Sequence, residues 1–256
     1  MLRLVGHTRP VIDESALADA SGAPERSAPR GARARVRAEL TREIKQVARR
    51  HLAETGAAGL SLRAVARELG MVSSAVYRYF PSRDELLTAL IVDAYTAIAE
   101  AAETAEAAVR RGDLAGRWLA IARATRRWAV RHPHEHALIF GSPVPGYQAP
   151  TDTIDPAARI PLLMLAVLAD AAAAGREPAA AGTAMPRPLR PDFTRLRAQL
   201  GSTLSDRYLA RAVLAWAELV GLINFELFGH LHNVITDYEA HFDYQARSIG
   251  HDLGLG

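Results

Sequence analysis

The spacing of apolar residues along the chain predicts helices throughout and no strand. A first helix is expected over residues 34–54, because Ile44, Val47 and Leu52 recur at helical spacing between Arg and Glu residues. Two shorter helices are expected next, one following Ser61 as its N-cap and one over residues 73–80. The later helices are expected over residues 83–109, 114–131, 134–140, 156–174, 205–228 and 236–253.

Proline, glycine and capping residues predict where these helices begin and end. Gly70 supplies the turn between the second and third helices, and Pro81 ends the third. Ser82 and Glu85 then form a capping box, in which the Ser82 hydroxyl accepts a hydrogen bond from the Glu85 amide. Two further stretches are rich in proline or glycine and are expected to be exposed connections, namely residues 141–150 and 175–192.

These elements predict an all-α protein in three parts. Residues 1–31 lack apolar periodicity and are expected to be a disordered tail. Residues 32–82 are expected to form a three-helix domain with a helix-turn-helix. Residues 83–256 are expected to form a helical domain, whose long first helix connects it to the helix-turn-helix. In a helix-turn-helix the second helix can enter a DNA major groove while the first crosses the backbone.

Positive charge is concentrated in the predicted helix-turn-helix. The whole chain has a net charge of +3, yet residues 26–83 contain thirteen basic and four acidic residues, a net +9 that leaves about −6 for the remainder. A solvated basic face would explain the charge alone, but phosphate binding explains why it coincides with the motif. The arginines at the end of the tail can equally be solvated or form an arm that reaches phosphates or the minor groove, namely Arg30, Arg33, Arg35 and Arg37.

Composition favours a soluble, cytoplasmic protein. The absence of cysteine excludes disulfides and thiolate zinc sites and fits a reducing compartment. Residues 1–20 lack the apolar core of a secretory signal. The most apolar stretch, residues 160–174, is interrupted by Asp170 and is shorter than the roughly 20 apolar residues that span a bilayer. We therefore expect no membrane association, and no motif calls for a cofactor.

The helix-turn-helix region resembles the TetR family of bacterial transcriptional regulators. Four segments match at the family's spacing: Gly59-Leu-Ser-Leu-Arg-Ala-Val-Ala, Leu69-Gly70, Val76-Tyr-Arg-Tyr-Phe80 and Ser82-Arg-Asp-Glu-Leu86. The body from about Leu114 resembles the C-terminal type named for a Trp-x-x-x-His-Gly motif, although Val220 stands at the histidine position. Val72 stands where the family usually has a Ser or Thr that caps the recognition helix, so Ser73 is expected to take over part of the capping.

The resemblance implies that the third helix faces DNA. Hydroxyl and phenol groups on its outer side can donate to phosphates or base edges. Ser61 and Arg83, at the starts of the second and fourth helices, are expected to bind phosphates, whereas Tyr77 or Tyr79 could instead pack the small core. The expected DNA-binding residues are Ser61, Arg63, Ser73, Ser74, Tyr77, Arg78, Tyr79 and Arg83.

The resemblance also implies a homodimer and a small-molecule effector. The last two helices would pair with those of a second subunit in a four-helix bundle. A mostly apolar cavity in the body would bind the effector, although the same side chains could simply form the core. The candidate ligand-binding residues are Trp118, Trp128, Phe140, Tyr147, Met164, Trp216 and Phe225.

The sequence therefore predicts a transcriptional regulator, by family default a repressor, that a small apolar or amphipathic effector releases from a palindromic operator. A nonspecific DNA binder is one alternative. A helical metal-dependent enzyme is another, using either His132 with His136 or Glu226 with His230. Pro133 makes the first pair unfavourable, because proline is expected to begin a new helix. His132 would then lie before this helix and not on the same face as His136. We expect no catalytic residue and no metal.

Overall fold

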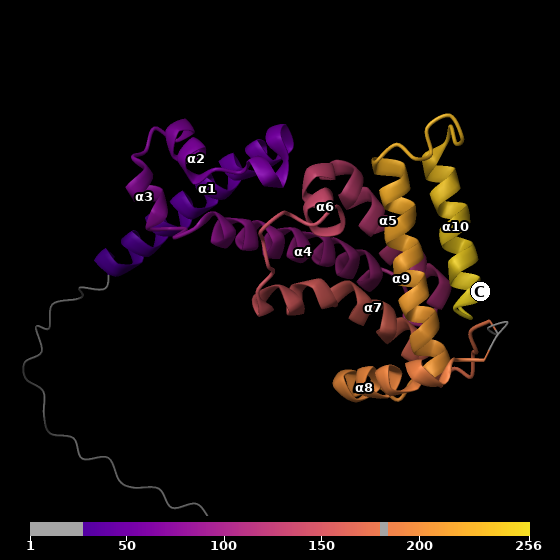
Figure 1. Cartoon of the computed structure of the whole chain (residues 1–256). Helices are drawn as coiled ribbons and strands as arrows, with labels where there is room; N and C mark the ends of the chain where they lie inside the picture. The colour runs from indigo at the N-terminus through magenta and orange to yellow at the C-terminus, as the bar shows by residue number, and fades with distance from the viewer. Residues whose placement is uncertain (1–27, 180–183) are drawn as a thin grey trace, which may run out of the picture. The chain divides into compact units, whose positions relative to one another are not determined.

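The computed structural model describes residues 28–179 and 184–256, so the predicted tail lies almost wholly outside the described residues. Every regular element in the described ranges is helical, which confirms the all-α prediction (Figure 1). The elements are α1 (Ala28–Gly59), α2 (Leu62–Glu68), α3 (Ser73–Tyr77), α4 (Arg83–Ala107), α5 (Leu114–Arg131), α6 (Pro133–Phe140), η1 (Thr151–Thr153), α7 (Ile154–Ala173), η2 (Arg187–Leu189), α8 (Arg190–Leu200), α9 (Asp206–Leu227) and α10 (Tyr238–Asp252).

The chain divides into two units, residues 1–40 and residues 41–256. In the first unit the described residues form the beginning of α1, and the side chains of residues 31–39 are exposed. In the second unit α1 continues beyond its expected end to Gly59, with a break in helical geometry at Gly56, where φ is 68°. The domain boundaries expected at residues 31 and 82 stay predictions.

The helices around the helix-turn-helix enclose a small apolar core of their own. Ile44 on α1, Val65 on α2 and Val76 on α3 are fully buried together with Leu86 and Leu87 on α4. The first turn of α4 is fixed by Ser82, whose hydroxyl accepts from the Glu85 amide at 3.1 Å as predicted. The core therefore extends into α4, so the long helix begins as part of the helix-turn-helix domain.

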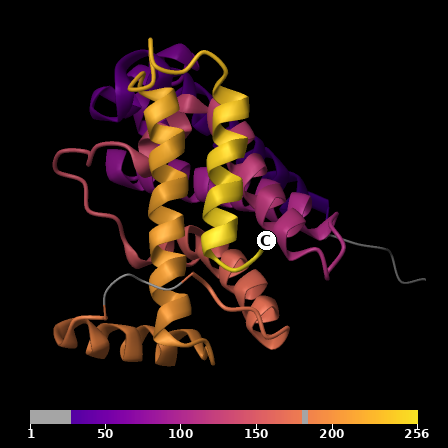
Figure 2. The same ribbon diagram turned by 90° about the vertical axis from the view of Figure 1, so that its right-hand side faces the viewer.

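A second and larger core fills the body between α4, α5, α7, α9 and α10. Trp118 on α5 lies at its centre, 2% exposed, and its indole N–H donates to the carbonyl of Ala246 on α10 at 2.6 Å. Gly250 lies against the same ring, since a Cβ there would come within 2.7 Å of the Trp118 Cδ1 atom. Glycine thus lets α10 pack tightly on α5. Figure 2 shows α10 beside α9 on one face of the body.

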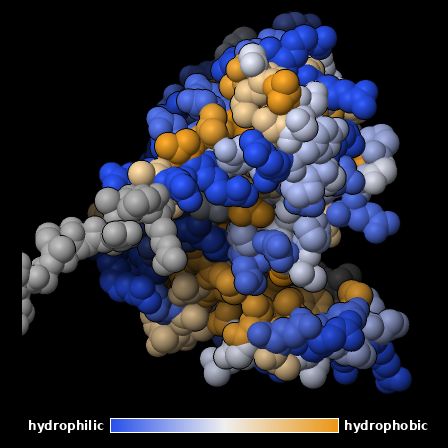
Figure 3. All heavy atoms as spheres, turned by 90° about the vertical axis from the view of Figure 1, so that its left-hand side faces the viewer, coloured by the Kyte–Doolittle hydropathy of each residue, from blue (hydrophilic) through white to orange (hydrophobic). Residues whose placement is uncertain are grey.

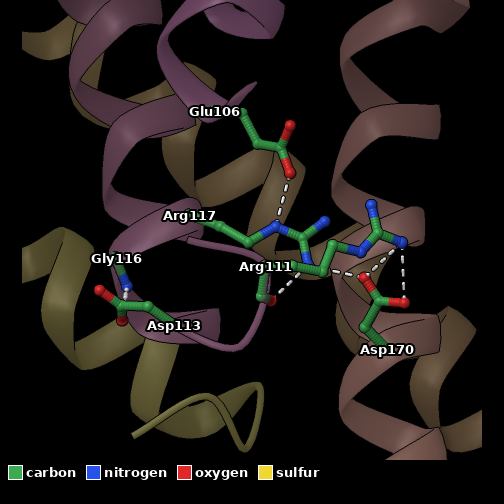
Figure 4. Close-up of polar contacts among 6 residues, drawn as sticks. All are labelled: Glu106, Arg111, Asp113, Gly116, Arg117 and Asp170. Carbon is green, nitrogen blue, oxygen red and sulfur yellow. Dashed lines mark hydrogen bonds and ion pairs between the residues drawn. The ribbon is translucent and has the colours of Figure 1, made fainter. Parts of the chain in front are cut away.

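A buried arginine holds the far end of α4 to α5 and α7. Arg117 on α5 is 1% exposed. Its Nε donates to the Glu106 carboxylate at 2.5 Å and its Nη1 to the Asp170 carboxylate at 2.6 Å (Figure 4). The same Nη1 also donates to the Arg111 carbonyl at 3.2 Å. Burial alone would raise the pKa of Asp170, but hydrogen bonds from Arg117 and Arg111 hold this pKa below its ordinary value.

Besides the bounds of α1, two expectations about secondary structure need correction. The third helix ends at Tyr77 rather than Phe80, although the amides of Tyr79 and Phe80 still bond to the Val76 carbonyl as a final irregular turn. Residues 175–192 were expected to be a connection, but η2 and the start of α8 lie within it. The prolines there do not exclude a helix, because proline is tolerated in the first helical turn, where the amide needs no intrahelical partner.

Two segments have the length and apolar composition of membrane-spanning helices, residues 151–173 and 206–227. The first is longer than the apolar stretch identified from the sequence because the helix begins earlier. Both segments contribute side chains to the core of the body, Met164 from one and Leu219 from the other. Core helices of soluble proteins pass the same test of length and composition, so the finding is weak evidence for a membrane span.

Candidate nucleic-acid interface

The helix-turn-helix is held together by one cap, one turn and a few buried side chains. The Ser61 hydroxyl accepts from the Ala64 amide at 3.5 Å and starts α2. Gly70 turns the chain between α2 and α3 with φ of 64°, a conformation that favours glycine. Leu62 and Val76 then bury their side chains in the common core. These contacts on the inner side of the motif hold α3 in place, and its outer face takes no part in the core.

The structure leaves part of the expected DNA-contacting set exposed on α3. Ser74 is exposed, and Tyr77 is 40% exposed although it is aromatic. Arg78, just after α3, is exposed as well. Ser73 and Tyr79 are half-buried, and Tyr79 packs against the apolar core of this region. Ser74 and Tyr77 are therefore the expected residues best placed to reach a ligand, while Tyr79 also serves packing.

The start of α3 differs from the expectation for Ser73. The N-cap residue is Val72, whose backbone is extended and whose side chain is 71% exposed. No side chain caps α3, so the expected takeover of capping by Ser73 was wrong. A serine at the first helical position follows the N-cap and so does not occupy the site from which a hydroxyl reaches the N2 and N3 amides. The first amides of α3 consequently have no side-chain acceptor.

Arg83, expected to bind phosphate, and Arg63, also among the expected DNA-binding residues, have different surroundings. Arg83, at the start of α4, donates from Nε to the Leu60 carbonyl at 3.2 Å and from Nη2 to the Ala57 carbonyl at 2.8 Å. It thereby satisfies carbonyls at and just beyond the C-terminal end of α1 and ties this end to α4. Arg63 on α2 is exposed and makes no hydrogen bond or ion pair with any residue that the structure describes. Its guanidinium is available for a phosphate without breaking an existing contact.

Several basic residues of α1 are neutralised by acidic partners that sequence reasoning missed. Lys45 and Arg49 both contact Asp93 on α4, at 2.7 and 2.6 Å, and Arg49 also contacts Glu135 on α6 at 3.1 Å. Lys45 and Arg49 are one helical turn apart, a spacing visible in the sequence, but their partners lie more than 40 residues away. The net charge of +9 counted for residues 26–83 is therefore larger than the positive charge that is free to contact DNA.

A second ion-pair group joins α1 to α2. Glu68 accepts from Arg50 at 2.6 Å and contacts the His51 ring at 2.5 Å. The hydrogen bond from Arg50, followed by the contact with His51, lowers the pKa of Glu68. This group keeps α2 fixed against α1 on the side away from the core.

The candidate ligand residues of the body do not line one common cavity. Tyr147 lines a cleft of about 610 Å³ between α4, α6 and the loop before α7. Met164 and Trp216 line an apolar groove of about 290 Å³ between α7, α8 and α9. Phe225 lies 53% exposed on the α9–α10 face. Trp118 belongs to the core described above.

Two more of these aromatic residues act in packing. Trp128 is 5% exposed and stacks on His132 with ring centres 5.1 Å apart. Phe140 contacts Tyr95 and Trp216 edge to face, with ring centres 5.8 and 5.7 Å apart. Phe140 thus lies between the cleft that Tyr95 lines and the groove that Trp216 lines.

The residues of the enzyme alternative have structural partners instead of a shared site. His136 is fully buried and its Nε2 bonds to the Asn224 side-chain oxygen at 2.8 Å, while His132 contacts Glu135. Burial lowers the pKa of His136 despite the hydrogen bond to Asn224. Among the described residues no three His, Asp or Glu side chains are grouped to hold a metal.

The second pair of the enzyme alternative is also occupied by structural contacts. Glu226 accepts two hydrogen bonds from Arg126, at 2.7 and 2.8 Å. The His230 ring lies against Phe225, with ring centres 5.1 Å apart. A carboxylate held by both arms of a guanidinium is not free to act as a base or as a metal ligand.

Comparison with known proteins identifies both halves of the chain. Residues 44–90 match the family described as bacterial regulatory proteins of the tetR family. Residues 118–249 match the family described as tetracyclin repressor-like, C-terminal domain. The first match covers the helix-turn-helix and the first part of α4, and the second covers most of the body.

Relatives and solved structures match over most of the chain. The HTH-type transcriptional regulators Rv1816 of Mycobacterium tuberculosis and Mb1846 of Mycobacterium bovis are each 44% identical over 227 residues, which cover 86% of this chain and 94% of theirs. The crystal structure of SCO4313 is similar with a TM-score of 0.67 and 36% identity, covering 84% of this chain and 97% of that one. A protein of unknown function from Rhodococcus sp. RHA1 shares the fold, with a TM-score of 0.64, 22% identity, and coverage of 84% and 95%.

These matches agree with the helix-turn-helix and with the all-helical body. The chain therefore belongs to the TetR family of helix-turn-helix transcriptional regulators, which are DNA-binding and non-enzymatic.

Proposed function

We propose that the protein is a homodimeric repressor that binds a palindromic operator through α3 and the start of α2. The observation that carries this proposal is the exposed outer face of α3, where Ser74 and Tyr77 project from a rigidly packed helix-turn-helix. Arg63, with no partner among the described residues, supplies a phosphate contact on α2. Hydroxyl groups on the recognition helix read bases, whereas arginines on the flanking helix fix its register.

Dimerisation through α9 and α10 is the second part of the proposal. The two helices lie side by side on one face (Figure 2). Several of their large apolar side chains are exposed to solvent. Exposed apolar patches of this kind mark protein interfaces. The exposed residues on or between these helices are Leu214, Phe225, Phe228, Val234 and Tyr244, whereas the exposed Val213 lines the groove between α7, α8 and α9.

The dimer would place two recognition helices in successive major grooves, about 34 Å apart. An effector that binds the body more tightly in another arrangement of α4 would change this spacing and lower the affinity for the operator by linkage. We propose a small apolar or amphipathic effector, supported by the apolar lining of the groove between α7 and α9.

Selection of duplexes from a random DNA library by the purified full-length protein tests the proposal. We expect an enriched palindrome and a footprint that Tyr77→Ala or Ser74→Ala changes at defined base pairs. The exposed Arg195→Ala in α8 is a control away from the helix-turn-helix, and should bind like the wild type. If no sequence were enriched, binding would be nonspecific, and the proposal of a specific operator would be refuted.

A further inference from the structure

An apolar side chain projects into solvent at the start of α3. Val72 is 71% exposed, as much as any large apolar side chain that the structure describes. Over residues 41–90 the only other exposed large apolar side chain is that of Tyr77, on the outer face of α3. In the upper half of Figure 3, which views the molecule from the side of the helix-turn-helix, small hydrophobic patches lie among hydrophilic side chains. Val72 therefore adds an apolar group to a surface that is otherwise mostly polar.

The local backbone makes valine an unfavourable residue at this position. Val72 is the N-cap of α3, with φ of −68° and ψ of 140°, and its carbonyl accepts from the Ala75 amide at 2.9 Å. Serine, threonine, asparagine and aspartate are preferred at an N-cap because their side chains accept from the first helical amides, which valine cannot do. Met71 packs against the apolar core in its place, so the core gains nothing from Val72. A residue that breaks a local rule without a structural gain points to a functional role.

We propose that Val72 determines base specificity through an apolar contact with the C5-methyl group of a thymine in the major groove. This inference rests on the proposed function, in which α3 reads the operator. The N-terminal residues of a recognition helix are those that contact base edges. Thymine alone among the four bases presents a methyl group in the major groove, and apolar side chains recognise this group by direct contact. The side chain of Val72 has no donor or acceptor, so it can read no other feature of a base edge.

The residues around Val72 are compatible with a close approach to DNA. Ser74, two residues later, is exposed and carries a hydroxyl that can bond to a neighbouring base edge or a phosphate. No acidic residue occurs over residues 69–83, so no carboxylate of this segment would repel the DNA backbone. The start of α3 thus offers an apolar contact next to a polar one, and we expect the thymine to lie beside the base pair that Ser74 contacts.

Replacement of thymine by uracil tests the contact, because it removes only the methyl group and preserves base pairing. The duplex is the one enriched from the random library by the wild-type, full-length protein. Each thymine is replaced in turn by deoxyuridine, symmetrically in both half-sites. Burial of one methyl group corresponds to about a fourfold change in the dissociation constant, and two half-sites together give about 15-fold. We expect fluorescence anisotropy to show a loss of about this size at one thymine position, and a loss below about twofold at every thymine would overturn the proposal.

Val72→Ser separates recognition from folding, because it should change the two in opposite directions. Serine supplies the missing N-cap, so the urea midpoint of unfolding should rise. Loss of the valine methyl groups should at the same time abolish the difference between the thymine duplex and the uracil duplex. The ratio of the two dissociation constants is compared, since a new hydroxyl can change the affinity for every duplex equally. A ratio as large as that of the wild type would overturn the assignment to Val72.

Two matched variants complete the test. Val72→Thr keeps one of the two methyl groups, so it should keep part of the preference for thymine over uracil. Val213→Ser makes the same change as Val72→Ser at an exposed valine of α9, and should keep the full wild-type ratio. Loss of the preference in Val213→Ser would overturn the assignment. Failure to select any duplex would refute the specific operator and every base-reading residue with it, whereas a selected duplex that is insensitive to uracil would overturn only the role of Val72.

Discussion

The buried ion-pair network at Arg117 predicts a large difference between two arginines that bind the same carboxylate. Arg117 and Arg111 both contact Asp170, at 2.6 and 2.8 Å. The Arg117 side chain is 1% exposed and that of Arg111 is 74% exposed. Removing one partner of a buried pair leaves an uncompensated charge and costs about 3–5 kcal/mol. An exposed pair contributes about 0–1 kcal/mol because water screens it.

We therefore expect Arg117→Met to lower the free energy of unfolding by about 3–5 kcal/mol and Arg111→Met by less than about 1 kcal/mol. Urea titrations followed by circular dichroism, at one protein concentration, measure both. Much of the loss should come from the stranded Glu106 carboxylate, whose side chain is only 13% exposed. Arg117→Met combined with Glu106→Gln should then recover part of the stability. Equal losses in the two single variants would refute the reasoning.

The same network predicts a pH dependence. The pKa of Asp170 is lowered in the folded chain, because hydrogen bonds from Arg117 and Arg111 outweigh the effect of burial. The unfolded chain therefore binds more protons near the ordinary pKa of an aspartate, about 4. This contribution to stability is present above that pH and is lost as the pH falls through the folded-state pKa. Arg117→Met should reduce this acid-dependent loss, which a titration of stability between about pH 6 and 3 measures.

Three further predictions follow from single residues. Arg63→Ala should weaken binding to all duplexes and reduce the slope of log affinity against log salt by about one, measured by fluorescence anisotropy, whereas a base-specific effect would contradict a phosphate contact. Burial lowers the pKa of His136 in the folded chain, so as the pH falls the unfolded chain takes up this proton first. The stability of the fold should therefore decrease as the pH drops below about 6.5. His136→Gln should remove this decrease, which thermal unfolding scans at several pH values measure. Gly250→Ala should lower stability by about 1–3 kcal/mol in urea because its methyl group meets the Trp118 ring, and an unchanged midpoint would show that α10 shifts freely.

Helix positions were predictable where a local signal marks them. The sequence places the start of α4 at the capping box of Ser82, and the structure has the same start and the same hydrogen bond. The start of α5 at Leu114 and its end before Pro133 were also predicted correctly. Such boundaries depend on residues within one turn of each other, so their physics is contained in a short stretch of sequence. The helix α8 begins without a capping side chain, and no helix was predicted anywhere over its residues.

Contacts between distant helices could not be predicted in this way. Arg83 was identified from the family pattern as a phosphate ligand, but its guanidinium donates to the carbonyls of Ala57, Ala58 and Leu60. Met164 and Trp216 were named as ligand residues without any indication that they line one groove. These partners depend on the angle and register at which helices pack, which the spacing within each helix does not specify. The DNA-binding roles of all eight expected residues stay predictions.

The short helix α6 has a larger part in joining the two cores than its eight residues suggest. Glu135 contacts Arg49 on α1, His136 bonds to Asn224 on α9, and Phe140 packs between rings of α4 and α9. α6 is therefore bound to α1 through Glu135 and to α4 and α9 through Phe140 and His136. A shift of α4 would consequently move α6 or break its contact with α4. A signal between the proposed effector and the proposed operator would have to move α6 or break these contacts. In a double-mutant cycle, Arg49→Ala and Glu135→Ala should consequently be non-additive in their effects on DNA affinity as well as on stability.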